Sequence, residues 1–90
     1  MINMLDTMKM ALRIRHDMLD DEIQRNIDSA LLDLNIVGVE DDNHPLVIKA
    51  VEFYVKKEMG SSEQRAEYAK TYEQLRRTLS LAHREGDVNA

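Results

Sequence analysis

The chain has 90 residues, a formal net charge of −5, no cysteine, and 43% apolar against 32% charged side chains. This length suits one small domain over residues 1–90, with the composition of a folded rather than a disordered protein. The absence of cysteine excludes disulfides and thiolate metal sites. No apolar stretch approaches the about 20 residues of a membrane span or has the form of a signal peptide, so a cytoplasmic origin without membrane contact is expected.

The charge balance, 12 basic against 17 acidic side chains, argues against a protein that works by clamping phosphates. Arg76, Arg77 and Arg84 do cluster on a predicted amphipathic helix, with Glu73 and Glu85 close by. The simpler interpretation is ion pairing along that helix. Nucleic-acid binding through these arginines remains an alternative.

Two helices are predicted in the first third of the chain. Residues 4–12 place Leu5, Met8 and Leu12 at helical spacing. Residues 18–35 give the best periodic stripe in the chain, and Asp17 is the expected N-cap. Residues 36–39 are too short for a helix, so they are expected to form an extended connector, or a strand that pairs only in an assembly. Residues 40–43 then form a solvated acidic loop.

Two further helices complete the prediction. The third begins at Pro45, capped by Asn43 or His44, and Gly60 is expected to end it in the left-handed conformation. The fourth begins at Ser61 or Ser62, with capping-box spacing to Gln64, and runs to about residue 85, where Gly86 ends it. Residues 87–90 are expected to fray. The predicted fold is all-α, a small bundle of four helices with a long C-terminal helix.

The predicted core is drawn from the apolar stripes of the last three helices. Its members are Ile23, Ile27, Leu31, Leu34, Val47, Val51, Val55, Tyr72, Leu75 and Leu79. Met8 and some of the other N-terminal methionines are most simply adaptable core side chains. The alternative is association with other subunits, for which Met4, Met8, Met10 and Leu81 form a surplus of apolar side chains.

Catalytic and metal-binding patterns are weak in this sequence. His16 with Asp20, and His44 after Asp41, can be drawn as ligand pairs, but neither matches a known metal spacing. There is no glycine-rich phosphate loop, nucleophile elbow or paired-carboxylate cleft. The sequence therefore predicts no enzyme, no metal and no cofactor.

The order of features resembles a family of virion proteins. The residues that carry the resemblance span 4 to 82 and are Leu12-Arg13-Ile14, His16-Asp17, Asp20-Asp21-Glu22-Ile23, Ile27-x-x-Ala30, Pro45-Leu46-Val47-x-x-Ala50-Val51, Tyr54, Gly60 and Tyr72-x-x-Leu75. This pattern is similar to the small head–tail connector (adaptor) proteins of tailed bacteriophages, of the HK97 type, also labelled DNA packaging proteins. The segment 36–44 is short for an elaborate hairpin at that place. The family has no catalytic residues to carry over.

The resemblance implies a ring of identical subunits in the virion, assembled in the host cytoplasm. The ring would be dodecameric on the portal protein and would join it to a stopper or tail-completion protein, with DNA as cargo in the central channel. An acidic domain suits such a passage, because lysine and arginine contacts to phosphate would retain the DNA. A free-standing helical protein–protein interaction module, or small regulator, is the alternative.

Two segments are the candidate sites within that interpretation. The loop residues Glu40, Asp41 and Asp42 are expected to face the channel or its rim, because three carboxylates inside a packed interface would each need a partner. The end of the fourth helix, with Leu79, Leu81, Ala82 and Arg84, is expected to dock on the portal as a mixed apolar and arginine surface. A merely solvated loop and a merely frayed helix end are equally compatible with the sequence.

Overall fold

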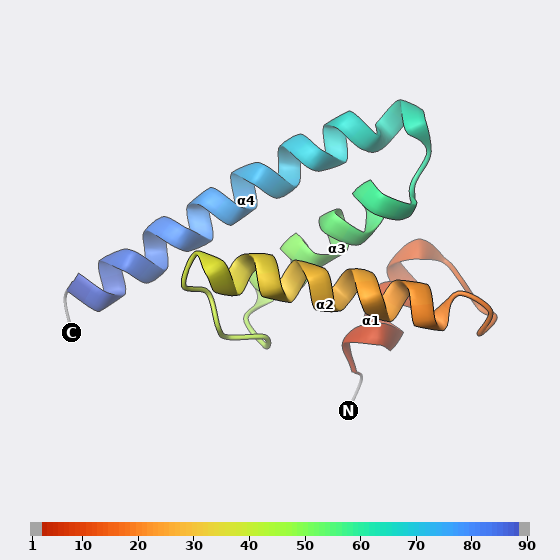
Figure 1. Ribbon diagram of the computed structural model, residues 1–90, viewed down its shortest axis with the longest axis horizontal. Helices are drawn as coiled ribbons and strands as arrows, with labels where there is room; N and C mark the ends of the chain where they lie inside the picture. Colours follow the sequence, from red (N-terminus) through yellow and green to blue (C-terminus); the bar gives the residue numbers. More distant parts are fainter. Residues whose placement is uncertain (1–2, 89–90) are drawn as a thin grey trace.

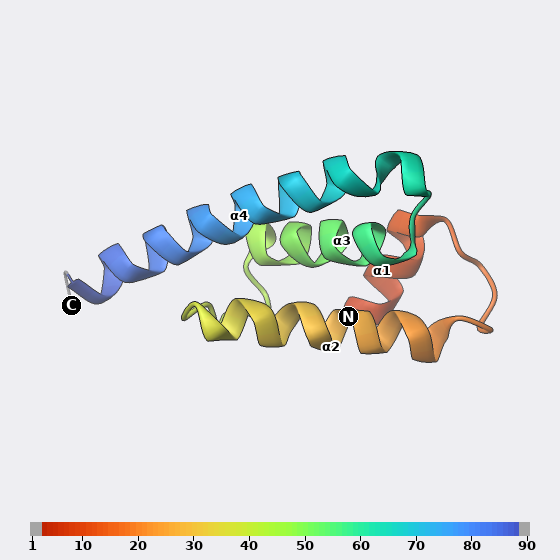
Figure 2. The same cartoon turned by 45° about the horizontal axis from the view of Figure 1, so that its top comes forward.

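The computed structural model describes residues 3–88, with side chains described as far as residue 82. Over this range the chain consists of helices joined by irregular segments, without a strand. Its elements are α1 (Met4–Leu12), α2 (Asp20–Ile36), α3 (Pro45–Met59) and α4 (Ser62–Val88). Helix α3 contacts all three other helices. It lies between α2 and α4, with α1 packed at one end (Figures 1 and 2). The all-α prediction is confirmed.

Side chains begin two of the helices as capping principles require. The Asn3 side chain accepts a hydrogen bond from the Asp6 N–H at 2.8 Å and starts α1. His44 precedes Pro45, and its Nδ1 accepts from the Leu46 N–H at 3.1 Å. A proline in this first position loses no bond, because its N–H would have no partner within the helix. Of the two caps predicted for α3, His44 is the one used.

The predicted cap of α2 was wrong. Helix α2 begins after Leu19, which makes no side-chain cap bond. The Asp17 carboxylate instead binds the Lys9 ammonium, with Nζ to Oδ1 at 2.7 Å, and Lys9 also reaches Asp20 Oδ1 at 2.7 Å. Lys9 on α1 therefore holds the segment that leads into α2. Asp17 uses its carboxylate in this ion pair and does not cap α2.

Helices α1 and α2 end in the same way, each with a residue in the left-handed conformation. These residues are Arg13, with φ of 60°, and Gly38, with φ of 90°. After α2, the Val39 N–H donates to the Leu34 carbonyl at 3.0 Å and the Gly38 N–H to the Asn35 carbonyl at 2.9 Å. This pair of bonds is the Schellman motif, which usually brings an apolar contact with it, and Val39 and Leu34 are both buried in the core. Residues 36–39 are thus a helix end rather than the predicted extended connector or strand.

Gly60 ends α3, but not for the predicted reason. Its φ of −85° and ψ of −179° are extended, not left-handed. A Cβ at this position would overlap the carbonyl oxygen of Lys56 and press on the Tyr68 ring. Glycine is needed here for space, so that the chain can turn sharply from α3 into α4. The predicted capping box is replaced as well, because Gln64 Oε1 accepts from the Tyr68 hydroxyl at 3.1 Å.

Helix α4 has 27 residues and passes through Gly86, which was predicted to end it. Of the residues 87–90 that were predicted to fray, 87 and 88 belong to the helix, and 89 and 90 lie outside the described residues. A glycine inside a helix costs about 1 kcal/mol relative to alanine, which alone does not stop a long helix. At about 1.5 Å per residue α4 is about 40 Å long and α3 about 22 Å, so α4 extends well beyond its partner (Figure 2). The domain measures 45 × 32 × 17 Å and has a radius of gyration of 13.5 Å, above the about 12 Å of a compact domain this size.

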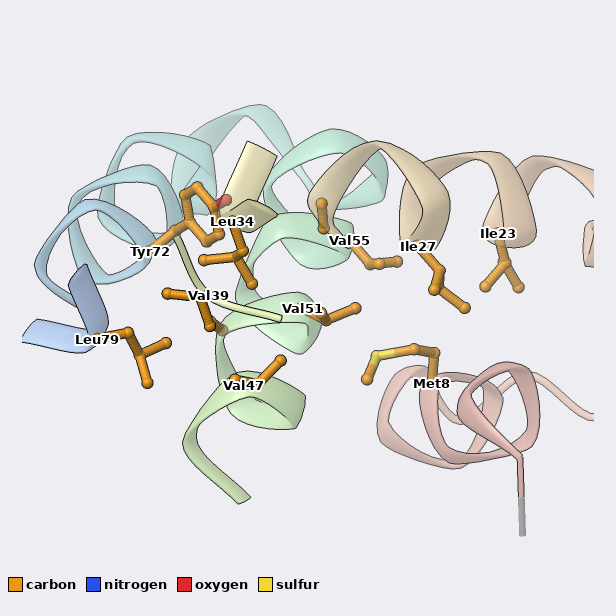
Figure 3. Packing of buried hydrophobic residues seen from close by; sticks show 12 residues of the cluster. Met8, Ile23, Ile27, Leu34, Val39, Val47, Val51, Val55, Tyr72 and Leu79 are labelled. Atoms are coloured by element: carbon orange, nitrogen blue, oxygen red, sulfur yellow. The ribbon is translucent and has the colours of Figure 1, made fainter. Parts of the chain in front are cut away.

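The core lies where α1, α2 and α4 meet α3. Figure 3 shows Met8 pointing from α1 toward the valines of α3 and the isoleucines of α2. Most of the predicted core is buried, but Leu31 and Leu75 are only partly covered at its edge. Met8 is fully buried, which confirms its interpretation as a core side chain and excludes it from the surplus available for association. The buried residues are Met8, Ile23, Ile27, Ala30, Leu34, Val39, Val47, Ala50, Val51, Val55, Tyr72 and Leu79.

Candidate functional site

The acidic loop between α2 and α3 is fixed at both ends, and its middle residues are exposed to solvent. Val39 enters the core before it, and His44 caps α3 after it. Within it, Asp41 Oδ1 accepts from the Asn43 N–H at 3.0 Å, a turn formed by the aspartate on its own backbone. Glu40, Asp41 and Asp42 are exposed. No ion pair forms at these three carboxylates within the described part of the chain, so their charge reaches the solvent.

The candidate docking segment on α4 is divided by the structure. Leu79 is 7% exposed and belongs to the core, while Leu81 is 53% exposed and Ala82 also faces solvent. The Arg84 side chain lies outside the described residues. Leu79 therefore anchors this part of α4 from within, and the surface it was expected to present comes from its neighbours.

The loop and the end of α4 lie next to one another. A hollow of about 210 Å³ is lined by Val39, Asp41 and His44 from the loop, Val47 from α3, and Leu79 and Ala82 from α4. From the sequence, the loop was predicted to face the channel and the end of α4 to dock on the portal, as two separate sites. Because they share a hollow, any partner that touches one is close to the other.

A larger groove of about 550 Å³ runs between α2 and α4, with α3 as its floor, and sequence reasoning missed it. Leu32 and Ile36 form one edge and are 65% and 75% exposed. Ser29, Leu32 and Ile36 recur at spacings of three and four, which puts them on a second face of α2, opposite the core stripe. This spacing is visible in the sequence, but the core stripe of the same helix is longer and more apolar and was the only stripe predicted for it. The lining consists of Ser29, Leu32, Asp33, Ile36, Tyr54, Lys57, Ala69, Tyr72 and Glu73.

A polar cluster bridges this groove at its base. The Tyr72 hydroxyl donates to Asp33 Oδ2 at 2.6 Å, and Arg76 Nε lies 3.0 Å from the same oxygen. Burial of the phenol, and then its bond to the Asp33 carboxylate, raise the pKa of Tyr72 above its usual value. Arg76 is thus committed to holding α4 against α2, which weakens the nucleic-acid interpretation of the arginine cluster.

The lysine that joins α1 to α2 has a similarly structural role. Hydrogen bonds to Asp17 and then Asp20 raise the pKa of Lys9, and the bond to Lys9 lowers the pKa of Asp17. Asp20 is therefore not free to act with His16 as a ligand pair. His16 Nδ1 accepts from the Met18 N–H at 3.3 Å, and His44 Nδ1 is used by its cap.

Two other kinds of site are absent from the residues that the structure describes. No three histidine, cysteine, aspartate or glutamate side chains among them come together as a metal site would require. No helix in the part of the chain that the structure describes is long and apolar enough to cross a bilayer.

Comparison with known proteins gives no relative: no protein-family model, curated sequence or solved structure matches this chain.

Proposed function

We propose that this chain is a structural subunit of a tailed-phage virion, forming a ring between the portal and the stopper or tail. DNA would pass through the ring as cargo. The observation that carries the proposal is the spread of large exposed apolar side chains over a very thin helical domain. They are Met10, Met18, Leu32, Ile36, Leu46 and Leu81.

Such a surface is unusual for a domain that works alone. A domain of this length buries only about 60% of the surface of its unfolded chain, and here one dimension is only 17 Å. Neighbouring subunits that cover exposed apolar groups add stability by binding only the folded form. Self-association would therefore stabilise this chain, and in a closed ring every subunit makes the same contacts with its neighbours.

Electrostatics supports passage of DNA rather than capture. The exposed carboxylates of Glu40, Asp41 and Asp42 repel phosphate, and Arg76 is occupied by Asp33. A channel wall formed by this loop releases no counterions from DNA, because its three charged side chains are carboxylates, so it does not hold the duplex. Since the loop shares a hollow with Ala82, the proposal places the channel rim beside the portal contact.

The test of the proposal is binding to a portal encoded next to this chain. Removal of residues 81–90 should abolish co-sedimentation with the portal, because Leu81 and Ala82 leave the docking surface while Leu79 stays to close the core. Removal of residues 89–90 alone is the control and should bind normally. Circular dichroism should show both variants folded. A shortened chain that bound the portal as well as the full one would refute the docking assignment.

A free-standing interaction module is the second candidate, favoured by the groove between α2 and α4. This function predicts a stable dimer whose mass, by light scattering, does not change with concentration. A connector subunit instead remains monomeric or weakly associated until it is concentrated or placed on a portal.

A further inference from the structure

The exposed apolar side chains fall into groups at opposite ends of the domain. Leu32 and Ile36 lie near the C-terminal end of α2, whereas Met10 and Met18 flank the connection between α1 and α2. Helix α2 runs between these two ends in both views (Figures 1 and 2). We call the first group the α2 ridge, formed by Leu32 and Ile36.

The other end is hollowed and basic. A hollow of about 430 Å³ is lined by Lys9, Met10, Arg13, Ile14 and Arg15, and we call it the basic hollow. Met10 is 69% exposed, and Arg13 and Arg15 are also exposed. Lys9 is committed to Asp17 and Asp20. The two arginines therefore give the free positive charge at this end.

Carboxylates lie beside the α2 ridge. Of the five acidic residues of α2, Asp20, Asp21 and Glu22 lie in its first turn at the other end, and Asp33 is bound by Tyr72 and Arg76. Asp28 lies one turn before Leu32 on the same face and is exposed, and Glu73 is exposed in the groove beside the ridge, where Lys57 is paired with Glu58. Exposed apolar side chains beside two carboxylates, Asp28 and Glu73, thus lie at one end of the domain, and a hollow lined by two arginines lies at the other.

We propose that the α2 ridge of one copy of this chain docks into the basic hollow of a second copy. Leu32 and Ile36 supply the apolar contact, and Met10 adapts its flexible side chain to them. Attraction of the Asp28 and Glu73 carboxylates for Arg13 and Arg15 of the second copy orients the encounter. The two surfaces differ and lie at opposite ends, so the contact is head-to-tail and a bound pair keeps one free ridge and one free hollow, to which further copies can bind. This inference rests on the proposed function for its closure into a ring.

A head-to-tail contact can be tested by complementation between two defective variants. The ridge variant, Leu32→Lys with Ile36→Lys, and the hollow variant, Met10→Ser with Arg15→Glu, change only one surface each. The four side chains are exposed, so both variants should fold. Leu46→Lys, another exposed apolar site at 40%, is the matched control.

Sedimentation of the full chain from about 1 µM to about 1 mM should show association beyond a dimer. Each variant alone should weaken that association about tenfold or more, while Leu46→Lys leaves it unchanged. An equimolar mixture of the two variants should give a dimer that grows no further, because its remaining surfaces are the defective ones.

Three results would overturn the inference. Variants that associate like the wild type would show that other surfaces meet, and variants that fail to dimerise when mixed would indicate a contact of like with like. A wild-type chain that stays monomeric over the whole range would refute the contact itself. The portal experiment is independent of all three: a chain that associates by this contact but binds no portal refutes the proposed function alone.

Discussion

Arg13 and Gly38 occupy equivalent places in the chain, although their side chains have nothing in common. Each adopts a positive φ at the C-terminal end of a helix, and each lies within the same pair of backbone hydrogen bonds. The left-handed conformation costs a residue with a Cβ about 1–2 kcal/mol, but glycine adopts it freely. One of these two helix ends is therefore strained and the other is not.

Exchanging the residue types should change stability in opposite directions. We expect Gly38→Ala to lower the free energy of unfolding by about 1–2 kcal/mol and Arg13→Gly to raise it by at most about 1 kcal/mol. Urea unfolding followed by circular dichroism measures both. Effects of the same sign would contradict this account of the helix ends.

Tyr72 is the residue whose polar atom contributes most clearly to the fold. Tyr72→Phe removes the hydroxyl that donates to Asp33 Oδ2 at 2.6 Å while keeping the buried ring. Because the acceptor is a carboxylate, we expect a loss of about 1.5–3 kcal/mol in the free energy of unfolding. Tyr54→Phe is the matched control, since this ring packs against Tyr72 edge-on. An equal loss in both variants would argue against a specific role of the Tyr72 bond.

The raised pKa of Tyr72 also predicts a pH dependence. The folded protein holds this phenol protonated, whereas the unfolded chain releases the proton near pH 10. The stability from Tyr72 is therefore fully present below about pH 10 and is lost as the pH rises above it. Wild-type unfolding curves should shift to lower urea more steeply than those of Tyr72→Phe over this range. Parallel shifts would contradict the prediction.

At the scale of elements, α2 has two apolar faces with different energetic roles. Ile27 is 1% exposed and Leu32 is 65% exposed. Ile27→Ala should lower the free energy of unfolding by about 2–5 kcal/mol, whereas Leu32→Ala should change it by less than about 0.5 kcal/mol. Leu31→Ala should fall between them, since Leu31 lies at the edge of the core. Urea unfolding of the three variants checks the order.

The helices were predictable because their apolar residues recur at helical spacing, and α1 begins and ends where that spacing placed it. Several other helix ends were not predictable from the sequence, because they depend on contacts with residues elsewhere in the chain. Asp17 has the residue type and position of a local N-cap, but its carboxylate binds the Lys9 ammonium instead. Gly60 looks like a left-handed stop, but it is required by the closeness of Lys56 and Tyr68. Periodicity reports which face is buried and carries no information on such contacts.

At the scale of the whole molecule, the candidate site was predicted only in part. The exposed acidic loop follows from three consecutive carboxylates, which no short loop can bury. Its closeness to Ala82 depends on how α4 crosses α3, and the groove beside Leu32 depends on how far α2 and α4 diverge. Such packing angles are set by many side chains together, so a single stripe does not reveal them.

The acidic loop gives a prediction at the same scale. If the chain forms the proposed ring, a virion with lysine at Glu40, Asp41 and Asp42 should assemble normally, but its DNA should leave slowly or be trapped at low salt and be released as salt increases. The control carries lysine at Asp6, Glu63 and Glu67, which are also exposed and give the same net charge. Normal ejection from the loop variant at low salt would show that the loop does not face the channel.

The position of α3 between its neighbours has a consequence for how the protein forms. The main helix contacts join α1 to α2, α2 to α3, and α3 to α4, elements that follow one another along the chain. Chains whose contacts are local in sequence close only short loops on the way to the native state, and they fold in microseconds to milliseconds. If the chain forms the proposed ring, each subunit would be folded long before it meets another. The rate of ring assembly would then be set by how often folded subunits collide, and so by the concentration of this chain in the cell.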